Sequence, residues 1–141
     1  MKPDVIIFEG ISKSGKSTLR DYLRKNNDHA YITLDRFAAS MHVFSSFHEY
    51  ESNIDKWLAI DERLHGIAVI VYLTVSEKRM RERNADTLYI RHYNTIKALY
   101  DLYLENTSLP VVKINTSEIS INKACKKIME SIENESFCHR K

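Results

Sequence analysis

A nine-residue stretch near the start of the chain has the residue types of a phosphate-binding loop. The sequence contains only three glycines, and Gly10 and Gly15 both fall in this stretch, the second followed by Lys16 and Ser17. In this pattern backbone N–H groups surround a phosphate chain, the lysine reaches the β- and γ-phosphates, and the hydroxyl binds Mg²⁺. We therefore expect a nucleoside triphosphate to be bound by Gly10, Ile11, Ser12, Lys13, Ser14, Gly15, Lys16, Ser17 and Thr18. The alternative is a strand-to-helix turn that is merely rich in glycine.

An acid suited to phosphoryl transfer follows the second predicted strand. Asp35 comes directly after the expected strand 30–34, and ligands of open parallel sheets bind at the carboxyl ends of the strands. Its carboxylate is suited to hold Mg²⁺ or to accept a proton from the phosphate acceptor, and the two later strands end without an acid. The alternative role is an N-cap for the next helix, which aspartate often fills.

Arginines supply the cations that a transferred phosphoryl group needs. Arg36 follows the acid, and its guanidinium can bind a phosphate through two hydrogen bonds. Arg79 and Arg83 share one face of a short predicted helix, where like charges are unfavourable unless an anion lies between them. A triphosphate would supply that anion; a solvated helix or a nucleic-acid contact is the alternative. The catalytic candidates are Lys16, Asp35, Arg36, Arg79 and Arg83.

The composition is that of an ordinary globular domain. The 141 residues are 43% hydrophobic and 28% charged, and we assign residues 1–135 to one domain and 136–141 to a polar C-terminal tail. The net charge of +2 gives no general argument for a nucleic-acid partner. Cys125 and Cys138 are too few for a disulfide framework, and no apolar run is long enough to span a membrane. Because the first strand leaves no room for a signal peptide, we expect a cytoplasmic protein.

Strand and helix patterns alternate along the chain. Residues 67–73 form a continuous β-branched apolar run, typical of a parallel strand that is buried on both faces. The alternation predicts an α/β fold with three layers, in which helices cover both faces of a small, mainly parallel sheet of about four strands. The expected strands are 4–8, 30–34, 67–73 and 110–114. The expected helices are 18–25, 37–47, 51–64, a short one after Ser76, 88–104 and 119–132.

Four segments resemble thymidylate kinases. Residues 8–18 resemble the opening loop of these enzymes, and residues 35–40 resemble their Asp-Arg-Tyr-x-x-Ser segment. Residues 71–76, with the arginines that follow, are similar to the strand that leads into the lid, and residues 111–117 to the last strand. The match is colinear over nearly the whole chain. It implies a three-layer P-loop kinase core.

The resemblance also implies an activity. It points to transfer of the γ-phosphate of ATP to a (deoxy)nucleoside monophosphate, most simply dTMP or a similar nucleotide, with Mg²⁺ held by Ser17 and Asp35. In that comparison Arg36 would hold the acceptor phosphate, Phe37 would lie near the acceptor sugar or base, and Arg83 would be the lid arginine, supported by other lid cations. The acceptor residues would be Glu9, Arg36, Phe37 and Ser40. The related kinases are commonly dimers, so a homodimer is implied.

Two departures from the thymidylate kinase pattern keep other functions open. Ser12 stands where the family usually has an acid that holds the acceptor sugar. Only a short loop precedes the strand that leads to Asp35, whereas the family has a longer acceptor-binding segment there. A deoxynucleoside kinase or a polynucleotide 5′-kinase is therefore an alternative, and so is a nucleotide-binding module without catalysis.

Overall fold

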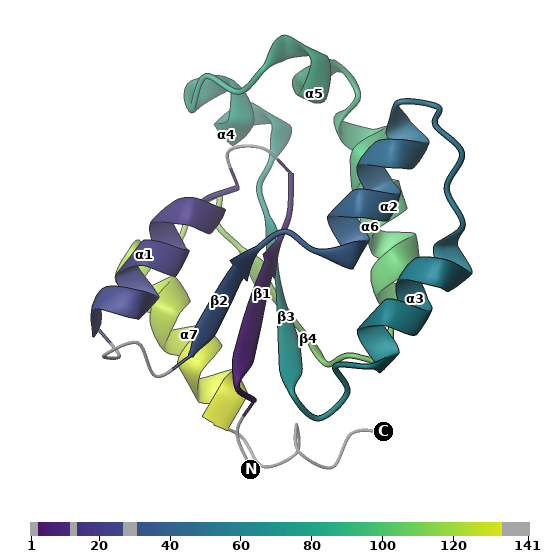
Figure 1. Cartoon of the computed structure of the whole chain (residues 1–141). Helices are drawn as coiled ribbons and strands as arrows, with labels where there is room; N and C mark the ends of the chain where they lie inside the picture. The colour runs from purple at the N-terminus through teal and green to yellow at the C-terminus, as the bar shows by residue number, and fades with distance from the viewer. Residues whose placement is uncertain (1–2, 12–13, 27–30, 134–141) are drawn as a thin grey trace.

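The fold is built on a sheet of four parallel strands, in a computed structural model that describes residues 3–11, 14–26 and 31–133. The strands are β1 (Val5–Glu9), β2 (Ile32–Asp35), β3 (Ala68–Thr74) and β4 (Val111–Asn115), in the order β2-β1-β3-β4. The central strand β1 pairs with both β2 and β3, and β3 pairs with β4. All four carboxyl ends therefore meet at one edge, at the top of Figure 1. The predicted parallel sheet is confirmed.

Helices cover both faces of the sheet. On one face α1 (Lys16–Asn26) packs against α7 (Ile121–Glu133). On the other, α2 (Ala38–Phe47) packs against α3 (Ile54–Glu62) and α6 (Tyr93–Asn106). Two short helices, α4 (Glu77–Glu82) and α5 (Thr87–Arg91), lie beyond the carboxyl edge (Figure 1). This confirms the three-layer α/β architecture.

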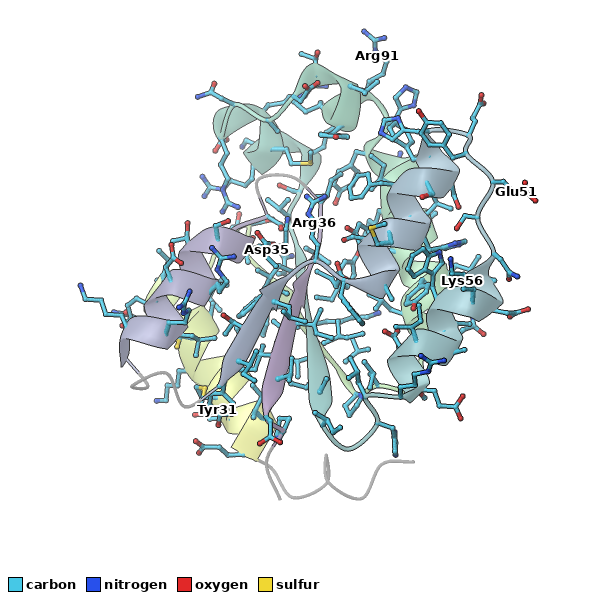
Figure 2. All side chains as sticks on the ribbon, viewed as in Figure 1. Tyr31, Asp35, Arg36, Glu51, Lys56 and Arg91 are labelled. Carbon is cyan, nitrogen blue, oxygen red and sulfur yellow. The ribbon has the colours of Figure 1, made fainter. Side chains whose placement is uncertain are left out.

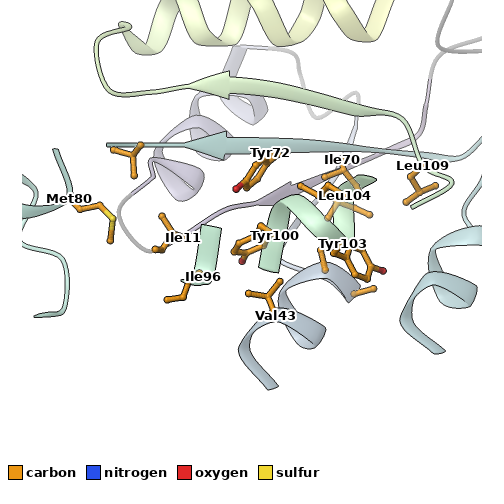
Figure 3. Packing of buried hydrophobic residues seen from close by; sticks show 14 of the residues in the cluster. Ile11, Val43, Ile70, Tyr72, Met80, Ile96, Tyr100, Tyr103, Leu104 and Leu109 are labelled. Atoms are coloured by element: carbon orange, nitrogen blue, oxygen red, sulfur yellow. The ribbon is translucent and has the colours of Figure 1, made fainter. Parts of the chain in front are cut away.

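Alternation along the strands divides the apolar residues between two cores. On β1, Ile6 and Phe8 belong to the core under α1 and α7, whereas Ile7 belongs to the core under α2 and α6. Successive side chains of a strand point to opposite faces, so a continuous apolar run serves both layers. In the second core Tyr72 of β3 and Tyr100 of α6 lie with ring centroids 5.4 Å apart (Figure 3).

Two tyrosines of α6 are core residues. Tyr100 and Tyr103 are fully buried. The Tyr103 hydroxyl donates to the buried Asp61 carboxylate of α3 at 2.7 Å, and the Thr107 hydroxyl donates to the same oxygen at 2.7 Å. Burial raises the pKa of Asp61, and these two donors satisfy an acid that would otherwise be costly to enclose. The contact fixes α3 against the end of α6.

The expected helix 88–104 is in fact two helices. α5 ends at Arg91, α6 begins at Tyr93, and His92 between them has φ −107° and ψ 25°, outside the helical region. The Tyr93 hydroxyl donates to the Val75 carbonyl at 2.7 Å, which ties the start of α6 to the end of β3. The apolar spacing continues across the break, so periodicity alone did not reveal it.

In the part of the chain that the structure describes, no helix is long and apolar enough to cross a lipid bilayer. The predicted tail 136–141, which includes Cys138, lies outside the described residues, as does Ala30 of the second expected strand. Cys125 is a buried free thiol on α7.

Candidate active site at the carboxyl edge of the sheet

The loop between β1 and α1 has a backbone that requires glycine. Gly10 has φ +147° and Gly15 has φ +99°, values that L side chains rarely adopt. A Cβ on Gly10 would lie 2.4 Å from the Leu73 carbonyl oxygen of β3. The loop therefore passes close to the end of β3 before α1 begins at Lys16. Ser12 and Lys13, two of the expected ligand residues, lie outside the described part of the loop.

The Lys16 ammonium lies inside this loop. Its Nζ donates to the carbonyls of Gly10 and Ile11, each at 2.9 Å, and to the Ser14 hydroxyl at 3.3 Å. Burial, and then the charge of Arg36, lower the pKa of Lys16 to about 7. A cation enclosed in this way binds an anion favourably, because the anion compensates for the hydration that burial removed. The loop geometry and this charge are suited to a phosphate group.

A cavity of about 510 Å³ adjoins the loop at the start of α1. Lys16, Ser17 and Arg83 contribute cationic and hydroxyl groups to its lining. Such groups suit the phosphates of a nucleotide. The other lining residues are Gly15, Thr18, Leu19, Thr116, Ile119, Ser120, Ile121 and Ala124.

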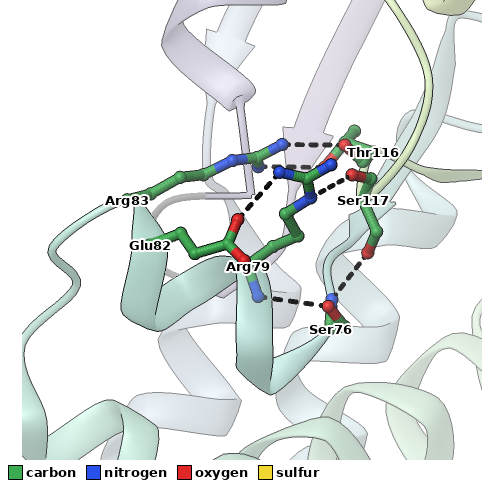
Figure 4. Close-up of polar contacts among 6 residues, drawn as sticks. All are labelled: Ser76, Arg79, Glu82, Arg83, Thr116 and Ser117. Atoms are coloured by element: carbon green, nitrogen blue, oxygen red, sulfur yellow. Dashed lines mark hydrogen bonds and ion pairs between the residues drawn. The ribbon is translucent and has the colours of Figure 1, made fainter.

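Thr116, which the sequence analysis did not identify, connects the loop to the lid, the segment of α4 that carries Arg79 and ends at Arg83. Its hydroxyl donates to the Ser14 carbonyl at 2.6 Å, across 102 positions of sequence. The Arg83 guanidinium donates to the Thr116 carbonyl at 2.8 Å and to its hydroxyl at 3.3 Å (Figure 4). The available signal was its position, directly after the last strand, where polar residues reach the carboxyl edge.

The second lid arginine contacts the same turn. Arg79 Nε donates to the Ser117 carbonyl at 2.7 Å, and Arg79 Nη1 pairs with Glu82 at 2.8 Å (Figure 4). The expected shared face of Arg79 and Arg83 thus turns toward the segment between β4 and α7. Glu82 supplies the negative charge beside Arg79 in this structure, whereas the sequence argument placed an anion between the two arginines. The residue was visible in the sequence as an i,i+3 partner of Arg79.

Asp35 ends β2 at the same edge of the sheet (Figure 2). It does not cap the next helix, because the N-cap of α2 is Phe37. Its carboxylate lies 3.6 Å from Arg20 of α1, and its side chain is 31% exposed. Arg20 was not predicted; its spacing of four from Lys16 places both residues on one side of α1. The acid is therefore accessible and adjacent to the phosphate loop's helix.

Arg36 has an unusual backbone. Its φ is +69°, in the left-handed region that is uncommon for a residue with a large side chain. Its N–H donates to the Phe8 carbonyl at 2.8 Å, and its guanidinium carbon lies 4.7 Å from the centre of the Phe44 ring. Backbone strain of this kind clusters at functional sites, since the surrounding structure must enforce it.

Glu9 is fully buried and caps α2 from the end of β1. Its Oε2 accepts from the backbone N–H groups of Phe37 at 3.1 Å and Ser40 at 3.3 Å, and its Oε1 accepts from the Ser40 hydroxyl. The resemblance implied that Glu9 is an acceptor residue; here its carboxylate contacts the first turn of α2. Burial, only partly offset by these hydrogen bonds, raises the pKa of Glu9 to about 7.

The same hydrogen-bond network reaches the phosphate loop. The hydroxyls of Ser40 and Tyr100 lie 2.7 Å apart, and the Tyr100 hydroxyl donates to the Gly10 carbonyl at 3.2 Å. That carbonyl also accepts from Lys16. Ser40 and Glu9, two predicted acceptor residues, therefore lie in the buried wall that joins the loop to α2.

Comparison with solved structures identifies the class of fold. The YorR protein from Bacillus subtilis, in complex with phosphorylated GDP, superimposes with a TM-score of 0.75 at 23% identity, over 94% of this chain and 97% of that chain. Thymidylate kinase from Candida albicans superimposes with a TM-score of 0.64 at 14% identity, over 98% of this chain and 94% of that chain. No protein-family model matches the sequence, and no curated protein sequence matches it significantly. The chain has the fold of the thymidylate kinase-like P-loop kinases.

We predict that Gly10→Ala abolishes nucleotide binding. The new methyl group would meet the Leu73 backbone at 2.4 Å, so the loop must shift, with a cost of about 1–3 kcal/mol in unfolding free energy. Gly66→Ala is the matched control, because Gly66 also has a positive φ (+80°) but open space at its Cβ position. Urea unfolding and ATP titration compare the two variants. Wild-type ATP affinity in Gly10→Ala would contradict the assignment of the loop.

We predict that Glu9→Gln changes how stability depends on pH. The pKa of Glu9 rises from 4.5 to about 7 on folding, so between these values the folded protein binds more protons and wild-type stability falls as pH rises. Glutamine cannot ionise, and its amide can still donate to Ser40. From pH 4.5 to 8 the stability of Glu9→Gln should rise relative to wild type by roughly 3 kcal/mol. Glu105→Gln on the exposed side of α6 is the control; equal pH profiles for all three proteins refute the prediction.

Proposed function

We propose that the chain is an ATP- and Mg²⁺-dependent nucleotide kinase that phosphorylates a (deoxy)nucleoside monophosphate, most simply dTMP. The observation that carries the proposal is the shared edge at which the enclosed Lys16 and the Asp35–Arg36 pair meet. Asp35 pairs with Phe8 in the register of β1 and β2, and the Arg36 N–H donates to the Phe8 carbonyl, so both residues lie beside the end of β1 from which the loop begins. Phosphoryl transfer requires this combination of a phosphate cradle, an acid and cations on the migrating group.

On the donor side, the loop would bind the phosphates of ATP through backbone N–H groups and Lys16. The cavity beside α1 would accept the rest of the nucleotide, with Arg83 and Arg79 on the lid as supporting cations. The Ser17 hydroxyl and the Asp35 carboxylate are oxygen donors of the kind that Mg²⁺ prefers, and substrate phosphates usually complete its coordination. Bound Mg²⁺ would neutralise charge that develops on the transferred group.

On the acceptor side, Arg36 would bind the monophosphate of the acceptor. Its guanidinium is suited to two parallel hydrogen bonds with phosphate oxygens. Phe37 is the N-cap of the adjacent helix α2. Glu9 of β1 fixes the start of that helix through its hydrogen bonds with Phe37 and Ser40. Asp35, next to Arg36 in sequence, would then lie near the phosphate that is transferred.

The structural neighbours support a nucleotide kinase but leave the base open. One is a thymidylate kinase, and the other was solved with phosphorylated GDP. We therefore place dTMP first in a panel that also holds the other deoxynucleoside monophosphates and GMP. A homodimer and a cytoplasmic location stay predictions.

We predict that the purified protein consumes ATP only when an acceptor is added. With Mg²⁺·ATP and dTMP, ADP and dTDP should form in equal amounts, as measured by liquid chromatography. Asp35→Asn should lower turnover by about 100-fold or more, since a positioned acid contributes on that order. Asp55→Asn, an equivalent change at an exposed position of α3, should leave the rate unchanged. ATP consumption that is the same with and without every member of the panel would overturn the proposal.

The alternatives give different products in the same assay. A deoxynucleoside kinase converts thymidine to dTMP, and a polynucleotide 5′-kinase labels a 5′-hydroxyl oligonucleotide from γ-labelled ATP. A binding module shifts in melting temperature with ATP but forms no product with any acceptor.

We predict that ATP binding takes up a proton at alkaline pH. The pKa of Lys16 is lowered from 10.5 to about 7 in the nucleotide-free protein, so at pH 8.5 the amine is largely neutral, and phosphate binding favours its charged form. Calorimetry in buffers of different ionisation enthalpy should show close to one proton taken up at pH 8.5 and much less at pH 6. Glu9→Gln should behave as wild type does, which excludes Glu9, whose pKa is also about 7. Uptake that is equal at the two pH values would refute the assignment.

A further inference from the structure

Arg36 is held by an aromatic ring in this structure. Its guanidinium carbon lies 4.7 Å from the centre of the Phe44 ring, within the range of a cation–π contact. Phe44 belongs to α2, the helix that begins two residues after Arg36, at Ala38. Because Arg36 also has a left-handed backbone, both its main chain and its side chain are constrained at the edge of the site.

The Phe44 ring is itself fixed from two directions. Tyr100 of α6 contacts it at a centroid distance of 6.1 Å and an interplanar angle of 83°, and Tyr89 of α5 contacts it at 5.8 Å and 65°. Such edge contacts restrict rotation of the ring. Tyr100 is in turn hydrogen bonded to Ser40 and to the Gly10 carbonyl of the phosphate loop. Through Tyr100, the position of the Phe44 ring is therefore fixed relative to the phosphate loop.

A ring holds a cation in a way that a carboxylate cannot. A carboxylate partner would position the guanidinium but would also neutralise it and occupy its N–H donors. The aromatic face attracts the positive charge and leaves the N–H donors of the guanidinium available to another ligand. An arginine intended for an incoming phosphate benefits from this arrangement, because it is ordered before the ligand arrives and keeps its charge.

We propose that Phe44 is a positioning residue that presents the Arg36 guanidinium to the phosphate of the acceptor. The inference rests on the proposed function, since it takes the acceptor to be a nucleoside monophosphate. It adds to that function a residue which acts through Arg36.

The test measures monophosphate binding in the absence of ATP, by calorimetry with dTMP, dCMP, dAMP and dGMP as probes. Phe44→Leu keeps apolar volume but removes the ring face. It should raise the dissociation constant of the bound monophosphate about 3- to 30-fold. Phe44→Tyr keeps the face and should stay within about twofold of wild type. The Mg²⁺·ATP dissociation constant should be unchanged in both variants.

Phe47→Leu is the matched control on the same helix. Phe47 packs on Tyr89 at 6.4 Å and on His92 at 5.2 Å, whereas Arg36 lies over Phe44. The same substitution at position 47 therefore perturbs the contact with α5 but not the hold on Arg36, and it should leave monophosphate affinity within about twofold of wild type. Equal losses in Phe44→Leu and Phe47→Leu would overturn the inference.

A double-mutant cycle separates positioning from a general structural role. In an Arg36→Gln background no guanidinium remains to be held, so Phe44→Leu should cause no further loss of monophosphate affinity. A loss as large as in the wild-type background overturns the inference and leaves the proposed function intact. If the wild-type protein binds none of the four monophosphates, the proposed function fails and this inference fails with it.

Discussion

The buried carboxylate of Glu9 is the constraint on which the rest of the site depends. It is wholly enclosed, and an acid in such a position is tolerated only when hydrogen bonds satisfy it. Two of its donors are backbone N–H groups in the first turn of α2, and the third is the Ser40 hydroxyl. The strand that carries the phosphate loop therefore dictates where α2 begins. Through Tyr100, the same network places α6 against the loop carbonyl that Lys16 also contacts.

The elements that could be predicted from sequence are those specified by local patterns. Continuous β-branched runs such as β3 indicate parallel strands buried on both faces, and the Gly-Lys-Ser spacing indicates the loop whether or not its partners are known. The break at His92 lay beyond this reasoning, because the apolar period continues through it and the contact that accompanies it, from Tyr93 to Val75, joins residues distant in sequence. Helix propensity and apolar periodicity are weak predictors where a contact with a distant residue determines the backbone conformation.

The candidate site divides in the same way. Lys16, Asp35 and Arg36 follow from motif and strand position, since the ends of parallel strands must meet at one edge. The role of Thr116, and the role of Glu9 in fixing α2, could not be predicted from sequence, because their partners are distant in sequence. For example, 102 positions separate Thr116 from Ser14. Glu82 is a different case. It lies one helical turn from Arg79 and was readable from the i,i+3 spacing.

The contact between Arg83 and Thr116 has a consequence for ligand discrimination. In the nucleotide-free protein two hydrogen bonds hold the guanidinium against the end of β4, and each contributes about 1 kcal/mol net. A ligand that binds Arg83 must first replace these two hydrogen bonds. Because the arginine is already released in only a small fraction of molecules, the apparent affinity of such a ligand is lowered in proportion to that fraction. A ligand that fills the cavity without engaging Arg83 incurs no such cost. Under the proposed function, only a phosphate chain long enough to reach Arg83 would meet this cost.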